Sequence, residues 1–289
     1  MAHSHDHDHR PGDPHTLHPP GIEESAELQK HVTPLVELTD VSISYGATSA
    51  LQNVSLKIWP RQFMAIVGPN GGGKTTLLRT VLGMIPMTSG HIHLRGKALR
   101  RGALDRVGYV PQLEAIDWNF PITVEEVIAM GFFVRNRWFG GIGANEKKKL
   151  HEIMERLNLA GLGQRHIREL SGGQQQAVFI GRALLGDPEL IFLDEPASGL
   201  DIRSRDDVIH FLHEINHQGV AIVLTAHDLN WVAAHLPWVV CLNRRLIAEG
   251  KPYQVFNPEV LKETYSGELL VMRQDGMVMI GERPHAPHS

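Results

Sequence analysis

The sequence predicts an α/β fold with a parallel β-sheet in its core, an antiparallel β layer and an inserted helical subdomain. From Leu190 onward, short apolar runs alternate with helical patterns, which is typical of βαβ units and a parallel sheet. Residues 35–68 hold consecutive strand patterns joined by tight turns, which indicate a β-rich opening layer. Residues 124–168 carry apolar side chains at helical spacing and little strand pattern, which indicates inserted helices.

Each element follows from the period of its apolar residues. Strands are expected where apolar and polar residues alternate or where a short apolar run lies between turn residues. These segments are 35–45, 51–59, 63–68, 91–94, 107–111, 190–194, 221–226 and 238–243. Helices are expected where apolar residues recur three and four positions apart. These segments are 74–84, 123–133, 146–159, 170–184, 205–218 and 229–236.

The chain is expected to have three parts. Residues 1–31 are rich in His, Asp and Pro and lack hydrophobic periodicity, so they are predicted to be a disordered tail. Residues 32–250 form the predicted folded domain, into which a helical subdomain of about residues 122–170 is inserted. Residues 251–289 are a C-terminal extension, too short for an appended regulatory domain.

The tail contains a second pattern. His3, His5, His7 and His9 alternate with short polar residues, so an extended chain would offer imidazoles suited to zinc, nickel or copper. A purification tag or a solubilising tail explains the same pattern. The sequence leaves these alternatives open.

Composition excludes several classes of protein. The longest apolar runs are far shorter than the roughly 18 residues that a membrane span needs. A formal net charge of -4 argues against an electrostatic nucleic-acid binder. The single cysteine, Cys241, excludes an internal disulfide framework and a multi-cysteine zinc site, and we expect it to be a buried strand residue.

The strongest motif is "GPNGGGKT", which follows a predicted strand and precedes a predicted helix. In that context the glycines let successive N–H groups point at phosphate oxygens, and the positive end of the helix adds to the attraction. Lys74 is expected to reach the β- and γ-phosphates, and the Thr75 hydroxyl to bind Mg²⁺. The predicted core is therefore a P-loop nucleotide-binding core.

Two adjacent acidic residues, Asp194 and Glu195, directly follow the apolar strand "LIFL". Asp194 is expected to hold Mg²⁺, because ligands bind at the carboxyl ends of strands in an open α/β sheet. Glu195 is then placed to take or orient a proton of the attacking water. Without the P-loop, these two residues could equally be a solvated strand end.

The segment "LSGGQ" places Ser171, Gly172 and Gly173 at the start of a helix, where unpaired N–H groups and the helix dipole form an anion site. Bare glycine backbone would let a phosphate come close. Because the P-loop already holds the phosphates of a nucleotide, a second cradle in the same chain has little use. We therefore expect a two-fold dimer in which this segment of each chain covers the nucleotide on the partner's P-loop.

With these motifs in order, the sequence resembles the ATP-binding cassette family from about Leu35 to Gly250. The motifs are "GPNGGGKTT", the glutamine of "YVPQ", "LSGGQ", "LIFLDEP", "SGLD" and "TAHD". The resemblance implies that Tyr45 stacks on adenine and that Gln112 senses Mg²⁺ and water. It also implies that Asp201 joins the two sites across the dimer and that His227 contacts the γ-phosphate. Without it, Tyr45 would be interpreted as a strand-end core residue and His227 as a turn residue.

The predicted site residues follow from the motifs and the resemblance together. The expected catalytic residues are Lys74, Gln112, Glu195 and His227. The expected nucleotide-binding residues are Tyr45, Gly68, Pro69, Asn70, Gly71, Gly72, Gly73, Lys74, Thr75, Thr76, Ser171, Gly172, Gly173 and Asp201. The expected Mg²⁺ ligands are Thr75, Gln112 and Asp194. The expected cofactors are ATP and Mg²⁺.

The resemblance is strongest to subunits that power importers for manganese, zinc or iron, because "DWNFPITV" is similar to a stretch of those proteins. It implies a homodimer of cassettes on the cytoplasmic face of the membrane, docked on two permease subunits, with an extracytoplasmic substrate-binding protein as an indirect partner and no nucleic acid. Trp118 and Phe120 would face the permease or merely pack the helical subdomain. Alternatives are an importer for siderophores or another small solute, and a soluble ATPase acting on nucleic acid or ribosomes.

Two positions depart from the family pattern. Ala177 stands where an arginine is usual, and Gly181 where alanine is common. Neither is expected to touch phosphate. Both could loosen the helix that follows "LSGGQ" and lower turnover.

Overall fold

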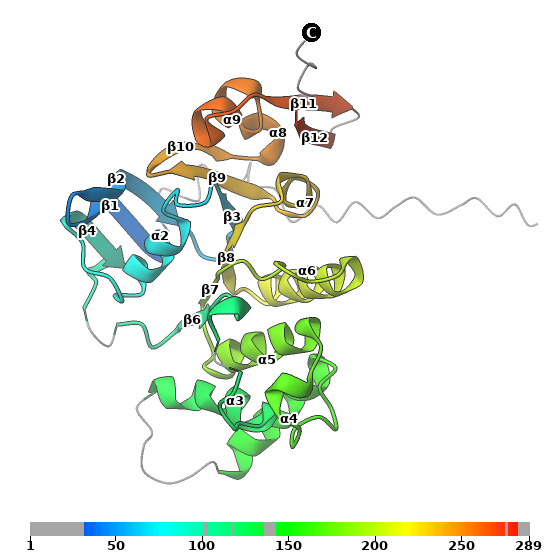
Figure 1. The fold of residues 1–289 in the computed structure, drawn as a ribbon. Coiled ribbons are helices and arrows are strands. Elements are labelled where there is room, and N and C mark those ends of the chain that lie inside the picture. The colour runs from blue at the N-terminus through cyan, green and yellow to red at the C-terminus, as the bar shows by residue number, and fades with distance from the viewer. Residues whose placement is uncertain (1–31, 101–102, 117, 136–142, 275–276, 283–289) are drawn as a thin grey trace, which may run out of the picture. The chain divides into compact units, whose positions relative to one another are not determined.

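The computed structural model describes residues 32–282 with the exception of 101–102, 117, 136–142 and 275–276 (Figure 1). The tail that is predicted to be disordered lies outside the described residues. From Thr33 onward the described residues form one unit by their internal contacts. None of the described helices is long and apolar enough to cross a bilayer.

The N-terminal layer is an antiparallel four-stranded sheet in the order β2-β1-β4-β5. Its strands are β1 (Val36–Tyr45), β2 (Thr48–Ile58), β4 (Ser89–Leu94) and β5 (Lys97–Ala98). One face is buried: along β1, Val36, Leu38, Val41 and Ile43 are covered while the residues between them are more exposed. This alternation is what predicted a half-buried sheet.

The second sheet has six strands in the order β10-β9-β3-β8-β7-β6. Its strands are β3 (Phe63–Val67), β6 (Val107–Val110), β7 (Leu190–Leu193), β8 (Ala221–Ala226), β9 (Trp238–Asn243) and β10 (Arg245–Gly250). All neighbours pair in parallel except β9 and β10. The assignment of residues 63–68 to the opening layer is wrong, because β3 lies between β8 and β9. Every residue of β3 is buried, as expected for a central parallel strand covered on both faces.

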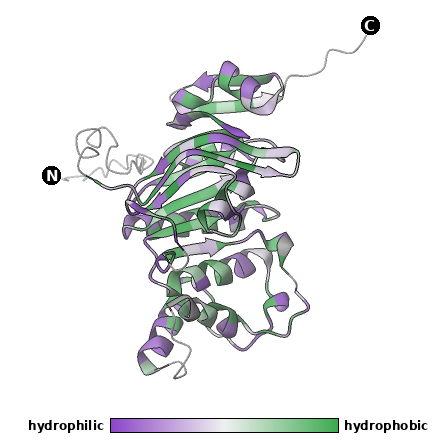
Figure 2. Cartoon of the chain, turned by 90° about the vertical axis from the view of Figure 1, so that its left-hand side faces the viewer, coloured by the Kyte–Doolittle hydropathy of each residue, from purple (hydrophilic) through white to green (hydrophobic). Residues whose placement is uncertain are grey.

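The six-stranded sheet separates two hydrophobic clusters. Alternate residues of β3 face opposite sides: Ala65 and Val67 join the cluster of the helices, whereas Met64 and Ile66 join the cluster of the antiparallel layer. Figure 2 shows hydrophobic residues running along the strands. Cys241 is fully buried on β9, as expected, and burial raises the pKa of its thiol to about 12.

In the described residues, three helices and two 3-10 turns form the predicted helical insertion and the helix after it. They are α3 (Val124–Ala129), η3 (Met130–Arg135), α4 (Ala144–Arg156), η4 (Ile167–Glu169) and α5 (Gly172–Leu185). Thr123 and Glu126 form a capping box that starts α3. Gly181 is buried in α5, and a Cβ atom there would lie 2.8 Å from Leu157 Cδ1 at the end of α4. Glycine therefore lets these helices approach closely, which explains one departure from the family pattern.

The remaining helices connect and follow the parallel strands. They are α2 (Lys74–Val81), η2 (Leu113–Ala115), α6 (Ile202–His217), α7 (Leu229–His235), α8 (Pro252–Val255) and α9 (Pro258–Tyr265). Strands β11 (Leu269–Gln274) and β12 (Met277–Glu282) pair as a separate two-stranded sheet. The Asn230 side chain binds this sheet to α7, accepting from Ile280 N at 2.7 Å and donating to Ile280 O at 2.9 Å. The sequence patterns predict no helices or strands for the C-terminal extension.

Candidate functional site

The glycine-rich loop lies between β3 and α2, as its motif requires. Gly73 adopts a φ of 95°, and a Cβ atom there would lie 2.8 Å from the Ala50 carbonyl oxygen. A Cβ atom on Gly68 would lie 1.9 Å from the Leu242 carbonyl oxygen. These two glycines are thus fixed by the packing of the loop against β2 and β9. Gly71 has open space on the side where a Cβ would be, and Asn70 is exposed.

Lys74 begins α2 with its side chain folded back over the loop. It is 5% exposed, and its Nζ donates to the carbonyl oxygens of Gly68 at 2.9 Å and Pro69 at 3.1 Å. Burial lowers the pKa of Lys74, while the charges of Glu195 and Asp194 partly oppose that shift. The ammonium has three donors, so one is left for a ligand in the loop.

Asp194 directly follows β7 and is 2% exposed. Its backbone N–H continues the pairing with β6 by donating to Val110 O at 2.9 Å. Its Oδ1 accepts from the Thr75 hydroxyl at 3.1 Å and from the Thr225 hydroxyl at 2.7 Å. A carboxylate and two hydroxyls therefore meet where the strand ends, beside the first turn of α2.

Glu195 adopts a left-handed backbone conformation, with a φ of 52°, in which its N–H donates to the Thr225 hydroxyl at 2.8 Å. This turn aims the carboxylate away from the strand and between two side chains. Its Oε2 accepts from Gln112 Nε2 at 3.2 Å, and its Oε1 is hydrogen-bonded to His227 Nε2. The positive φ marks a residue held in place by its surroundings.

Six of the predicted residues thus meet at one end of the parallel sheet. They are Lys74, Thr75, Gln112, Asp194, Glu195 and His227. We call this group the P-loop end. Gln112 follows β6 and His227 follows β8, so the cluster stands at the carboxyl ends of neighbouring parallel strands. Thr76, the next residue of α2, is half-buried and accepts from the Thr80 hydroxyl at 2.7 Å.

The segment Ser171–Gly173 lies elsewhere in the chain. It begins α5, which packs mainly on α3, α4, α6 and β6, whereas α2 packs mainly on β2 (Figure 1). Ser171 and Gln174 form a capping box. A Cβ atom on Gly173 would lie 2.9 Å from Ser204 Oγ, so close packing against α6 is a second reason for glycine, besides the predicted phosphate contact.

Two further predicted residues stand at element ends. Tyr45 is the last residue of β1 and is 53% exposed. Asp201 is the N-cap of α6, where its carboxylate accepts from Ser204 Oγ at 2.7 Å and Ser204 N at 3.0 Å. These two hydrogen bonds lower the pKa of Asp201.

Thr225 belongs to the candidate site and is not among the residues predicted from the sequence. Its hydroxyl, fully buried in β8, bonds both Asp194 and Glu195. A signal was present, because it is the polar residue in the otherwise apolar run "AIVLTA". A buried hydroxyl needs a partner, and the partner here is the acidic pair of the neighbouring strand.

A family model described as ABC transporter matches residues 51–198. The manganese transport system ATP-binding protein MntB of Halalkalibacterium halodurans is 38% identical over 86% of this chain and 99% of its own length. The zinc transport system ATP-binding protein TroB of Treponema pallidum is 37% identical over 81% of this chain and 88% of its own length.

Among solved structures, the ADP conformation of MJ1267, an ATP-binding cassette of an ABC transporter, has the same fold. Its TM-score is 0.72 at 26% identity, covering 81% of this chain and 99% of that chain. The family match includes the P-loop, the "LSGGQ" segment and the acidic pair. The chain therefore belongs to the ABC transporter family and is an ATP-binding, ATP-hydrolysing cassette.

Proposed function

We propose that this chain is the ATP-hydrolysing subunit of an importer for a divalent transition metal, namely manganese, zinc or iron. The observation that carries the proposal is the similarity to metal-transport subunits. Relatives named for manganese or zinc transport are 34–38% identical to this chain over more than four fifths of its length. Importers for siderophores or other small solutes are the alternatives that a transport assay has to exclude.

The P-loop end supports a role in binding ATP with Mg²⁺. Mg²⁺ prefers oxygen ligands, and the Thr75 hydroxyl and the Asp194 carboxylate lie 3.1 Å apart. These groups fit the ion, and we expect them and the Gln112 side-chain oxygen to hold it. Bound Mg²⁺ would neutralise charge on the β- and γ-phosphates. Lys74 would direct its remaining N–H donor at a phosphate oxygen.

Glu195 is the proposed general base. Its carboxylate is held by Gln112 and His227, and a carboxylate has further lone pairs with which to accept a proton from water. His227 is 41% exposed at its side chain, which leaves it accessible to the γ-phosphate. Tyr45, at the exposed end of β1, would stack on adenine.

The complete ATP site is proposed to form between two copies of the chain. The P-loop end and Ser171–Gly173 pack on different neighbours within one chain. A two-fold dimer would place Ser171–Gly173 of each copy against the nucleotide on the partner's P-loop. Asp201, exposed at the start of α6, would link the two sites across the dimer.

The proposed partners in the membrane are two permease subunits, with a substrate-binding protein reached only through them. The cassette would lie on the cytoplasmic face. Phe120 is 61% exposed and free to meet a permease, whereas Trp118 is half-buried and packs edge-on against Phe179 with ring centroids 6.3 Å apart. Phe120 is therefore the better probe of docking.

The test is to identify the membrane protein that co-purifies with the chain and to reconstitute both in vesicles. ATP-dependent uptake of manganese, zinc and iron is measured, with Glu195→Gln as the inactive control. Phe120→Ala should reduce uptake while leaving ATP binding unchanged. Uptake of a siderophore in preference to the free metals would overturn the substrate assignment. ATP hydrolysis that is stimulated by nucleic acid and not by any permease would overturn the assignment as an importer subunit.

A further inference from the structure

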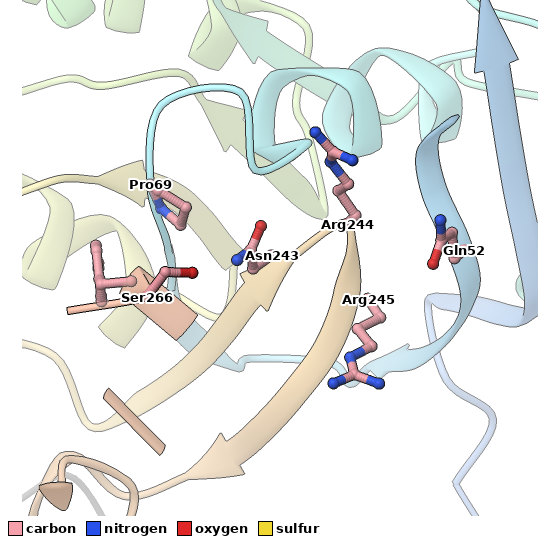
Figure 3. A pocket seen from close by; sticks show the side chains of 7 residues that line it. Gln52, Pro69, Asn243, Arg244, Arg245 and Ser266 are labelled. Carbon is pink, nitrogen blue, oxygen red and sulfur yellow. The ribbon is translucent and has the colours of Figure 1, made fainter. Parts of the chain in front are cut away.

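An open pocket of about 490 Å³ lies beside the P-loop (Figure 3). Its size is typical of small-molecule sites. It is lined by Gln52, Pro69, Asn243, Arg244, Arg245, Tyr265 and Ser266. Pro69 belongs to the P-loop, and the other residues come from β2, from β9 and β10 with the turn between them, and from the end of α9. Only Pro69 has a role in the proposed ATPase cycle.

The charge of the pocket favours an anion. Arg245 donates to Glu263 Oε1 at 2.7 Å, so its charge is partly balanced. Arg244 is exposed and forms no salt bridge with any residue that the structure describes. Figure 3 shows the two arginine side chains pointing in different directions from the turn. Arg244 is thus the anchor that remains available to a ligand.

Polar neighbours surround this anchor. The Ser266 hydroxyl and the Gln52 amide line the same pocket and can donate hydrogen bonds to oxygen atoms. The Tyr265 hydroxyl is buried next to the backbone of Gly68, so it is not available to a ligand in the pocket. A guanidinium with neutral donors around it is the arrangement that recognises a phosphate group.

The pocket is also connected to the P-loop through the backbone. Arg244 N donates to Gly72 O at 2.8 Å, and Arg244 O accepts from Gln52 N at 2.6 Å. The Leu242 carbonyl occupies the space beside Gly68 and Gly72, where a side chain would otherwise extend. The turn at Arg244 therefore forms the outer wall of the phosphate-binding loop. A ligand on this turn would change the charge and the position of that wall.

We propose that this pocket is a regulatory site for a small phosphate-bearing anion, which is anchored by Arg244 and weakens the binding of ATP to the P-loop. The sign follows from charge, because an anion beside the loop repels the phosphates of ATP. By linkage, bound ATP weakens the binding of the anion by the same factor. We expect about a five-fold effect, the lower end of typical coupling between sites. This site would act on the cassette whatever solute the transporter carries.

The test is to titrate the full-length chain with inorganic phosphate by calorimetry at constant ionic strength. The P-loop is first saturated with the Mg²⁺ complex of a non-hydrolysable ATP analogue, which prevents phosphate from binding in the P-loop. The variant is Arg244→Asn, since Asn tolerates the φ of 57° at that position. The matched control is Arg61→Asn, which removes an exposed arginine with a φ of 62° from the distant turn before β3.

One binding event is expected in the wild type and in Arg61→Asn, and at least a ten-fold weaker one in Arg244→Asn. In a second titration, phosphate should weaken the binding of the ATP analogue more in the wild type than in Arg244→Asn. Phosphate competes directly for the P-loop in both proteins, so the difference between them reports the new pocket. Two results would overturn the proposal: no binding event in the saturated wild type, or an equal event in Arg244→Asn. Neither result bears on metal transport.

Discussion

The P-loop end and the segment Ser171–Gly173 differ in how far one chain completes them. At the P-loop end, Asp194 and Glu195 already have partners for their carboxylates, and Lys74 is buried and hydrogen-bonded. At the start of α5, the capping box satisfies the N–H groups of Ser171 and Gln174, while those of Gly172 and Gly173 have no intrahelical acceptor. One region is preorganised for chemistry, whereas the other has N–H donors that, in the proposed dimer, would bind the partner's nucleotide.

The largest effect should come from changing the preorganised region. Glu195→Gln keeps the shape of the side chain but removes the proton acceptor, so ATP hydrolysis should fall by about 10²- to 10⁴-fold. ATP binding should remain, and the ATP-bound dimer should accumulate. Size-exclusion chromatography with ATP and a phosphate-release assay measure both. The exposed Glu259→Gln is the control. Near-normal hydrolysis in Glu195→Gln would shift the base role to another residue, with His227 first to be tested.

The second prediction tests whether the incomplete region serves the partner. Lys74→Ala and Ser171→Arg chains should each be inactive alone. A random equal mixture should recover about a quarter of wild-type activity, since half of the dimers are mixed and each has one intact composite site. Thermal melting confirms that each variant is folded. A mixture with no activity, or dilute monomers with the full rate per chain, would contradict the shared site.

The third prediction concerns the Thr225 hydroxyl, which is hydrogen-bonded to both residues of the acidic pair. Thr225→Val removes the hydroxyl that bonds both Asp194 and Glu195 without changing the volume much. We expect turnover to fall about ten-fold and unfolding free energy to fall by about 1–3 kcal/mol, because two buried groups lose a partner. Thr225→Ser restores the hydroxyl and should recover most of the turnover. If Thr225→Val hydrolyses ATP like the wild type, the hydroxyl does not position the acidic pair.

Part of the fold and of the candidate site could be predicted from the sequence. Local chemistry predicted the P-loop, because glycine, lysine and threonine at fixed spacing act within one turn. Periodicity predicted the helices up to α7 and most strands, but not α8 and α9. It failed for β3, because a short apolar run does not say which sheet it joins. Thr225 was missed because its partners lie about thirty positions earlier in the sequence, on the neighbouring strand.

The fourth prediction concerns the packing of α5, the helix that begins at Gly172. Gly181→Ala would improve the helix propensity of α5 by about 1 kcal/mol. The added Cβ would lie 2.8 Å from Leu157 Cδ1 and 3.3 Å from Ile153 Cγ2, and overpacking of this kind costs about 1–3 kcal/mol. We expect the cost of overpacking to exceed the gain in helix propensity. The free energy of unfolding should fall by up to about 2 kcal/mol, measured by denaturant titration. A more stable Gly181→Ala would mean that α4 moves aside freely.

The smallest effect concerns the charge of Lys74. Burial lowers the pKa of Lys74, so in the free protein it loses its proton at a lower pH than an ordinary lysine, whose pKa is 10.5. Bound phosphate favours the charged form and raises that pKa again. ATP binding should therefore take up a fraction of a proton at alkaline pH below 10.5, and ATP affinity should decline as pH rises through the lowered pKa. Calorimetry in buffers of different ionisation enthalpy measures the uptake, and Lys74→Arg, which stays charged, is the control. Equal proton uptake in both proteins would assign the uptake to another group. It would also show that the free P-loop does not lower the pKa of Lys74.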